Sequence, residues 1–89
     1  MRAVISVVGK DMVGILSKVS AICAANNVNI VEVTQSILQE FFCMIMVTDI
    51  SKCTLPLTEL ADTMSELGEK EGLCIHVMHE DIFNSMHRI

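Results

Sequence analysis

Apolar residues follow two different spacings along this chain, one typical of strands and one typical of helices. The first run, residues 3–8, is β-branched and almost wholly apolar, and it stops at Gly9. Such a run predicts a strand that is covered on one face and partly sheltered on the other, as in the centre of a sheet. A short segment with a charge pair, Lys10 and Asp11, separates it from Gly14.

From Gly14 the spacing becomes helical. One apolar stripe at positions i, i+4, i+7 and i+8, with Leu16 beside it, consists of Ile15, Val19, Ile22 and Cys23. This pattern predicts a helix over residues 14–26. The pair Asn26-Asn27 is expected to end it, because Asn tolerates the left-handed conformation of a C-terminal cap.

The next two runs predict a hairpin of long strands, residues 28–38 and 41–50, joined by a turn at Gln39-Glu40. Strict alternation in the first strand predicts one set of side chains facing the helices: Asn29, Val31, Val33, Gln35 and Ile37. The opposite face would carry Ile30, Glu32, Thr34, Ser36 and Leu38. The second strand is apolar on both faces, which favours an interior position or a partner on its outer face.

The C-terminal half repeats the order of helix and strand. Thr54 is expected to cap a helix with Pro56 in its first turn. Its apolar stripe consists of Leu57, Leu60, Ala61, Met64 and Leu67. Gly68 and the charged residues 69–72 are expected to end this helix before a strand over residues 73–79. Asp81 is expected to cap a tail helix that continues to residue 89.

The element order is therefore β-α-β-β-α-β plus a tail. Right-handed crossovers through a central hairpin predict the ferredoxin-like α+β sandwich, with a four-stranded antiparallel sheet, two helices on one face and a short C-terminal helix. The first and third strands would be central. The strand at residues 28–38 would be an edge without lysine or proline, which invites pairing with another chain.

Composition narrows the class of protein. The 89 residues suit a single domain, 52% of them are hydrophobic, and surplus apolar surface in a domain this small favours a dimer. The formal net charge of −5 argues against nucleic acid and against an anionic membrane surface. No signal peptide or membrane-spanning run is visible, and the four cysteines lack disulfide-scaffold spacing. We therefore expect a cytoplasmic protein whose cysteines are small core residues.

Several functions known for this architecture lack their residues here. The segment between Gly9 and Gly14 contains no thiol for a C-x-x-C metal carrier and no arginine for an acylphosphate hydrolase. Phe41 and Phe42 are at one end of their strand in an acidic chain, unlike an RNA-binding sheet. No Ser–His–Asp or paired-carboxylate arrangement is recognisable, so the sequence predicts no catalytic residue, no cofactor and no enzyme activity.

The histidines offer a weaker possibility. Cys74 and His76 share one face of the last strand, whereas His79 points to the other face. A two-ligand metal site is conceivable there, but two ligands without a third are a weak signal. Solvated strand histidines are the simpler interpretation, and His87 is expected to be exposed on the tail helix.

The segment from Gly9 to Gly14 is the remaining candidate. Glycines at a strand-to-helix junction permit turns that a Cβ would forbid, and the following helix presents free N–H groups that suit a carboxylate. The same segment could instead be only a turn in which Asp11 caps the helix.

Two motifs in this chain resemble the ACT domain family. One is the junction, residues 9–16, Gly-Lys-Asp-Met-Val-Gly-Ile-Leu, and the other is Val28-Asn29-Ile30 at the start of the second predicted strand. The resemblance extends over residues 1–80. The tail, residues 82–89, is similar to that of small stand-alone ACT proteins, which are themselves similar to the glycine cleavage system transcriptional repressor.

The resemblance implies a regulatory domain, residues 1–89 with the tail helix at 80–89, that binds an amino acid or similar metabolite at a homodimer interface. Two sheets would join side by side, with the ligand between the junction of one subunit and the second strand of the other. Carried over by position, the ligand-binding residues are Asp11, Met12, Val13, Gly14, Ile15, Asn29, Ile30 and Val31.

The junction departs from the family in one respect. Many ACT domains have Arg-Pro or Lys-Pro before the last glycine, where this chain has Met12-Val13. This difference bears on the choice of ligand and leaves the fold prediction unchanged. The sequence thus predicts a non-enzymatic homodimeric sensor acting through an unidentified regulated protein. The alternatives are an interaction module without ligand and a metal-binding protein using Cys74 and His76.

Overall fold

The structure is a computed structural model that describes residues 1–10 and 14–86, with residue 38 described in its backbone only. Within these residues the elements are β1 (Arg2–Gly9), α1 (Ile15–Ala25), β2 (Asn29–Leu38), β3 (Phe41–Asp49), α2 (Leu57–Glu71), β4 (Cys74–His79) and α3 (Glu80–Met86).

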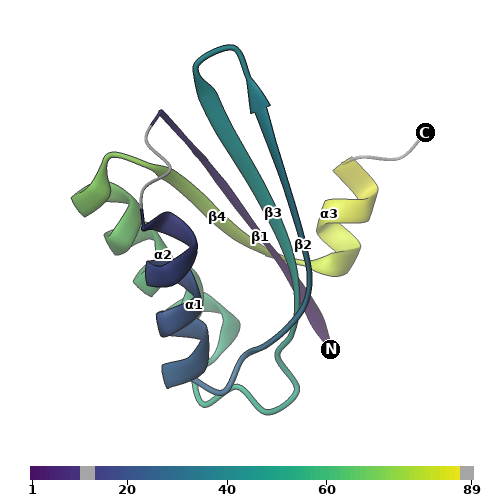
Figure 1. Ribbon diagram of the computed structural model, residues 1–89. Helices are drawn as coiled ribbons and strands as arrows, with labels where there is room; N and C mark the ends of the chain where they lie inside the picture. The colour runs from purple at the N-terminus through teal and green to yellow at the C-terminus, as the bar shows by residue number, and fades with distance from the viewer. Residues whose placement is uncertain (11–13, 87–89) are drawn as a thin grey trace.

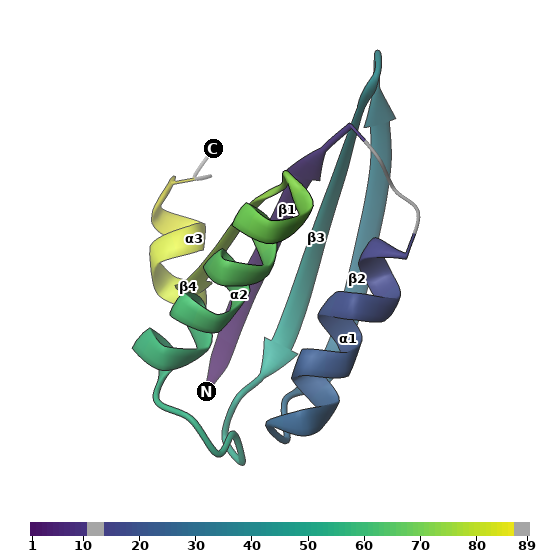
Figure 2. The same ribbon diagram turned by 90° about the vertical axis from the view of Figure 1, so that its left-hand side faces the viewer.

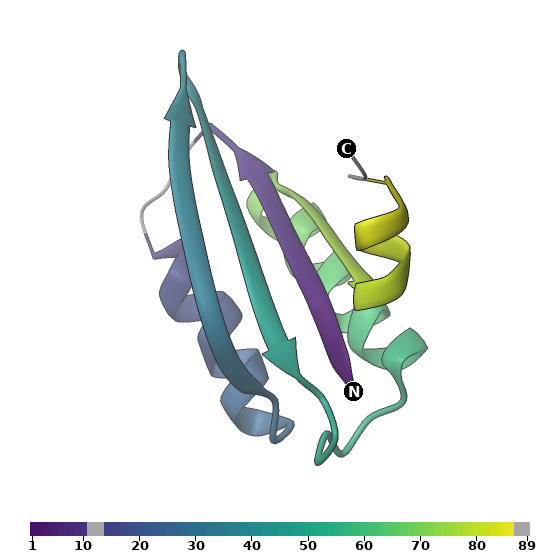
Figure 3. The ribbon, with the colours of Figure 1, turned by 90° about the vertical axis from the view of Figure 1, so that its right-hand side faces the viewer.

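The four strands form one sheet in the order β2-β3-β1-β4, and all neighbouring strands are antiparallel. Helices α1 and α2 cover one face of this sheet (Figures 1 and 2). Helix α3 lies on the opposite side, which Figure 3 shows from the uncovered face of the sheet. The predicted ferredoxin-like sandwich is confirmed, with β1 and β3 central and β2 at an edge.

The core lies between the sheet and the two larger helices. Ile5 and Val7 of β1 pair with Met46 and Met44 of β3, and all four side chains are fully buried. The helices add five buried side chains to this cluster: Ile15, Val19, Cys23, Leu60 and Met64. Methionine supplies much of the volume because the chain has no Trp or Tyr, and its flexible thioether fills irregular gaps.

The limits of α2 differ from the sequence prediction. The helix begins after Pro56, and no side chain caps it. The Thr54 hydroxyl instead lies 3.4 Å from the Asn26 carbonyl oxygen, at the end of α1, so the predicted Thr54 cap is wrong. The helix also runs past Gly68 and ends at Glu71, and the Gly72 that follows adopts a left-handed φ of 72°.

Gly68 has a packing role inside α2. A Cβ at this position would lie 2.7 Å from the carbonyl oxygen of Leu73. The absence of a side chain therefore lets α2 approach the start of β4 closely. This close contact explains why a glycine occurs within a helix that it does not end.

The C-terminal helix α3 is not capped by Asp81 as predicted. It starts at Glu80, directly after β4, so Asp81 lies in its first turn and is not its cap. The Asp81 backbone N–H donates to Nδ1 of His79 at 3.1 Å, and this imidazole satisfies one of the N–H groups that the helix leaves free. The predicted end of the tail helix, with His87, falls outside the described residues.

A β-bulge changes the alternation predicted for β2. Ile30 is opposite Thr48, but Glu32 is opposite the next residue, Val47, so Val31 is an extra residue. Ile30 consequently packs against the core, and Asn29 lies on the same face as Asp49. The prediction that Asn29 shares the helix-facing side with Val33 is wrong for this reason.

The cysteines do not all belong to the core. All four are free thiols: Cys23 is buried, Cys43 and Cys53 are half-buried, and Cys74 is exposed. Burial, followed by the neighbouring Cys53, raises the pKa of Cys23 to about 11. The expectation of core cysteines is therefore wrong for Cys74. No helix in the described part of the chain has the length and apolar character needed to cross a membrane.

Candidate functional site

The junction between β1 and α1 uses its two glycines in different ways. A Cβ on Gly9 would lie 2.3 Å from Cδ2 of Leu73, so Gly9 is required by close packing. Gly14 has a left-handed φ of 73° and immediately precedes α1, where a side chain would be strained. The first turn of α1 presents N–H groups that suit an anion.

The structure describes only part of the predicted junction site. Gly14 is exposed, and Ile15 is buried in the core, so its side chain anchors the helix while its backbone remains at the helix start. Asp11, Met12 and Val13 lie outside the described residues, as does the proposed capping of α1 by Asp11.

The second half of the predicted site, at the start of β2, is far from the junction in the same chain. Asn29 is opposite Asp49 on β3, which is opposite Arg2 on β1. Gly9, in contrast, is opposite Phe42 at the other end of β3. At 3.3 Å per residue the seven steps from Phe42 to Asp49 span about 23 Å. One subunit therefore does not bring the two halves together.

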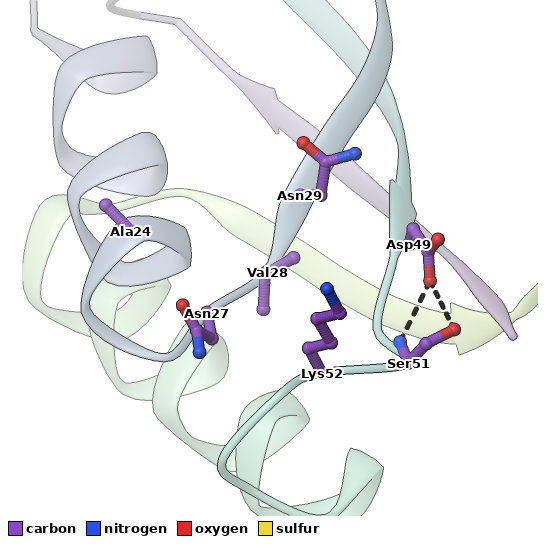
Figure 4. Close-up of a pocket in the computed structure, with 7 residues that line it drawn as sticks. All are labelled: Ala24, Asn27, Val28, Asn29, Asp49, Ser51 and Lys52. Atoms are coloured by element: carbon purple, nitrogen blue, oxygen red, sulfur yellow. Dashed lines mark hydrogen bonds between the residues drawn. The ribbon is translucent and has the colours of Figure 1, made fainter.

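A pocket with a volume of about 370 Å³ lies beside the start of β2 (Figure 4). Its walls come from the end of α1, the turn into β2 and the connection after β3. The lining residues are Ala24, Asn27, Val28, Asn29, Asp49, Ser51 and Lys52. It combines a carboxylate, an ammonium group and two amides with a small apolar wall, a composition suited to a small polar molecule.

The hydrogen bonds to Asp49 favour its ionised form. The Ser51 hydroxyl donates to Oδ1 of Asp49 at 2.6 Å, and the Ser51 backbone N–H donates to the same oxygen at 2.9 Å. These two bonds, the hydroxyl first, lower the pKa of Asp49 below its ordinary value. The amino group of Met1 also lies 4.0 Å from Asp49. Asp49 is therefore a carboxylate at neutral pH.

Lys52 provides the opposite charge. Figure 4 shows its side chain extending from the connection after β3 toward the space beside Val28, with the amino group directed into the pocket. The described residues include no salt bridge to Lys52. An exposed ammonium group and an ionised carboxylate thus border the same space, and together they can hold a molecule that carries both charges.

The sequence did not single out Asp49, Ser51 or Lys52. The signal that could have found them is topological: in an antiparallel hairpin the end of β3 lies beside the start of β2. This places residues 49–52 next to Asn29, the residue that the motif did identify.

The edge formed by β2 exposes several apolar side chains. Side chains from this strand and from the adjacent first turn of α1 are between 37% and 65% exposed: Leu16, Val31, Val33 and Ile37. Within the described residues β2 pairs only with β3, so its outer backbone groups have no strand partner. A long apolar edge of this kind is a template for pairing with another strand.

Comparison with known proteins agrees with this geometry. A family model described as "ACT domain" matches residues 2–78. A UPF0237 protein from Clostridium perfringens is 54% identical over 89 residues, covering 100% of both chains. The structure of an ACT domain protein from Streptococcus pneumoniae superposes with a TM-score of 0.82 at 34% identity, covering 93% of each chain.

A putative glycine cleavage system transcriptional repressor also shares the fold, with a TM-score of 0.71 at 22% identity over 89% of this chain and 47% of that one. The family model extends over most of the chain, and the curated relative matches it from end to end. The chain belongs to the ACT domain family.

Proposed function

We propose that this protein is a non-enzymatic regulatory domain that binds an amino acid or a similar small metabolite at a homodimer interface. ACT domains are typically regulatory ligand-binding domains, and the family membership supports the general role. The observation that supports the specific role is the pocket beside Asn29, at one end of an exposed edge strand whose other end is level with Gly9.

The proposed dimer joins two β2 edges in antiparallel orientation. A twofold axis near the middle of β2 would place Asn29 of one subunit opposite the end of β2 in the other. That end is level with Gly9, because Ile37 and Gly9 are both opposite Phe42. In Figure 2, α1 runs beside β2 and begins at its end nearer to the end of β1. The pocket of one subunit would therefore lie beside the junction of the other.

The dimer would also bury the apolar edge. Val33 is near the centre of β2, and Ile37 and Leu16 are at the end near the junction. Pairing the edges would remove these side chains from water and satisfy the outer backbone groups of β2. The result would be a continuous sheet of eight strands with α1 of each subunit near the axis.

The ligand chemistry follows from the charges around the pocket. Asp49 and the side-chain oxygen of Asn29 would accept hydrogen bonds from an α-ammonium group. Lys52 and the free N–H groups at the start of the other subunit's α1 would hold a carboxylate. In this proposal Asp11, Met12, Val13 and Gly14 form the wall contributed by the junction, and Ile30 and Val31 position Asn29.

Regulation would come from the ligand's dependence on two subunits. A ligand held by both would favour one form of the dimer and change its affinity for an unidentified regulated protein. We also propose a cytoplasmic location, which the four free thiols support. An interaction module that dimerises through β2 without a ligand is the alternative, because the exposed edge would serve it equally well.

Thermal unfolding in the presence of each of the twenty amino acids tests the proposal. A ligand at 100 times its Kd should stabilise the folded protein by about 2.7 kcal/mol. Asn29→Ala and Lys52→Ala should each abolish the shift. Lys70→Ala, an exposed lysine on α2, is the matched control and should leave it unchanged.

Two outcomes would contradict the sensor. One is the absence of any shift with all twenty amino acids together with no effect of Asn29→Ala. The other is a shift that persists in a protein that sedimentation shows to be monomeric. A dimer with no ligand response would instead support the interaction module.

A further inference from the structure

The exposed strand β4 carries a thiol and an imidazole side by side. Cys74 and His76 are two residues apart in the strand, so their side chains share one face, opposite to the face covered by α2. Sγ of Cys74 lies 4.0 Å from Nε2 of His76, and both residues are exposed. Neither side chain has another hydrogen-bond partner or ion pair within the described residues.

This separation is close to that of two ligands on one zinc ion. Zinc binds sulfur at about 2.3 Å and imidazole nitrogen at about 2.0–2.1 Å, usually with tetrahedral geometry. Two such ligands at a tetrahedral angle are about 3.6 Å apart. Small rotations of the two side chains would therefore bring both atoms to ligand positions. Thiolate and imidazole are also the donor types that zinc prefers.

One chain does not complete such a site. No group of three or more His, Cys, Asp or Glu side chains suited to a metal occurs in the described residues. A tetrahedral structural site requires two further ligands. They must come from outside the described chain, and a second copy offers the same pair.

The position of β4 makes a second copy accessible. β4 is an edge of the sheet, and within the described residues its only strand partner is β1. A twofold axis at Ile75 would place Cys74 opposite His76 of the second copy, and His76 opposite its Cys74. Directly opposed residues share a face and lie about 4.5–5.5 Å apart. Pairing of only three residues would thus bring four ligands together on one face.

We propose that Cys74 and His76 form half of a zinc site that is completed by the same pair from a second copy of the chain. Each thiol would release its proton to solvent on binding, and the resulting Cys₂His₂ site would hold one zinc ion between two β4 edges. This site is independent of the amino-acid pocket, which lies at the β2 edge of the sheet.

The test measures zinc binding to the full chain, reduced and freed of metal with a chelator. Native mass spectrometry and elemental analysis should find one zinc ion for every two chains, whether or not the protein is already a dimer. Co²⁺ should give the thiolate charge-transfer band and the intense visible bands of a tetrahedral site. Sedimentation should show that zinc doubles the mass of the assembly or extends it further.

Matched variants identify the ligands. Cys74→Ser and His76→Ala should each weaken zinc binding by roughly 100-fold or more, since each removes two of the four ligands from the site. Cys43→Ser changes another thiol on the same face, and His79→Ala changes the other histidine of β4. These two controls should bind zinc as the unchanged protein does, and circular dichroism verifies that all four variants fold.

Three results would overturn the proposal. They are a failure to retain zinc after dialysis, retention of zinc by Cys74→Ser at unchanged affinity, and binding of one zinc ion per chain without association. Loss of the amino-acid response in Asn29→Ala should leave zinc binding intact, which separates this site from the proposed sensor.

Discussion

The two edges of the sheet differ in length and in the chemistry that they expose. β2 is ten residues long and exposes Val33 and Ile37, with Glu32 its only charged side chain. β4 is six residues long, and its core-facing Ile75 is buried under α2. On its other face β4 exposes Cys74 and His76. One edge thus offers apolar area, and the other offers donor atoms.

The difference suggests two ways to associate. A long apolar edge can pair through desolvation and backbone hydrogen bonds alone, so its partner need only be another copy. A short edge that is already packed against a helix buries little further apolar area, so stable association there needs a stronger local interaction such as metal coordination. We therefore expect β2 pairing to persist without metal and β4 pairing to require it.

The largest expected effect comes from placing a charge on the β2 edge. In Val33→Lys the two new ammonium groups would lie close together near the proposed twofold axis, and like charges at such positions oppose pairing. We expect the Kd of the dimer to rise by more than about 100-fold, equivalent to about 2.7 kcal/mol. Analytical ultracentrifugation over a range of concentrations measures this change.

The control for that variant is Thr58→Lys, which adds the same charge to an exposed position of α2. It should leave the dimer intact. If both variants, or neither, dissociate the dimer, the interface does not involve β2. Zinc should still link Val33→Lys chains in pairs, because their β4 edges are unchanged.

A moderate effect is expected from Gly68→Ala, which changes the packing of α2 against the start of β4. The new methyl carbon would lie 2.7 Å from the Leu73 carbonyl oxygen, so α2 must move away from the strand. Alanine favours helix by about 1 kcal/mol, but overpacking typically costs about 1–3 kcal/mol, so the free energy of unfolding should fall. Urea unfolding measures the loss, and hydrogen exchange should quicken in β4 more than in β2.

Ser65→Ala, at an exposed position of the same helix, is the reference for Gly68→Ala. It should leave the free energy of unfolding nearly unchanged. Equal stability of the two variants would show that α2 can shift without loss, and the close packing of Gly68 would then have no energetic importance.

The smallest effect is expected at Asp49 and depends on pH. Its pKa is lowered in the folded protein, mainly by the Ser51 hydroxyl, so the ionised form stabilises the fold above the unfolded pKa of about 3.9. This stabilisation is lost as the pH falls through the folded pKa. The difference in free energy of unfolding between the unchanged protein and Asp49→Asn should therefore be constant near neutral pH and shrink as the pH falls below the unfolded pKa and through the lower folded pKa.

Ser51→Ala sharpens the measurement at Asp49. It removes the hydroxyl donor but keeps the backbone N–H, so part of the pH dependence should remain. If the free energy of unfolding of the unchanged protein and of Asp49→Asn changes in parallel at every pH, the charge of this carboxylate does not stabilise the fold.

Much of the fold could be predicted because its signals are local. The change of apolar spacing at Gly14, the Asn26-Asn27 pair and the turn at Gln39-Glu40 mark elements that the structure confirms. The errors arose where tertiary contacts decide. Thr54 bonds to the end of α1 and not to α2, and His79 supplies the N-terminal hydrogen bond that was assigned to Asp81.

The candidate site was predictable only where a motif marks it. Val28-Asn29-Ile30 identified the start of β2, but Asp49 and Lys52 come from a segment twenty residues away that folds beside it. The residues that line a pocket between two strands depend on which residues are paired across them. Alternation of polar and apolar residues does not predict this pairing when a bulge intervenes. The roles of Asp11, Met12 and Val13 remain predictions.

The bulge at Val31 determines which face of the sheet each residue of β2 occupies. After the bulge the odd-numbered residues of β2, such as Val33, face the helices. Asn29 precedes the bulge and, although odd-numbered, faces the other side of the sheet. Loss of Val31 would make Ile30 and Glu32 consecutive, as their partners Thr48 and Val47 already are, so Asn29 would stay opposite Asp49 in a regular ladder. A relative that lacks this extra residue would therefore show unbroken alternation in its sequence and keep the same partners between β2 and β3, so two chains can differ in their sequence period where their sheets agree.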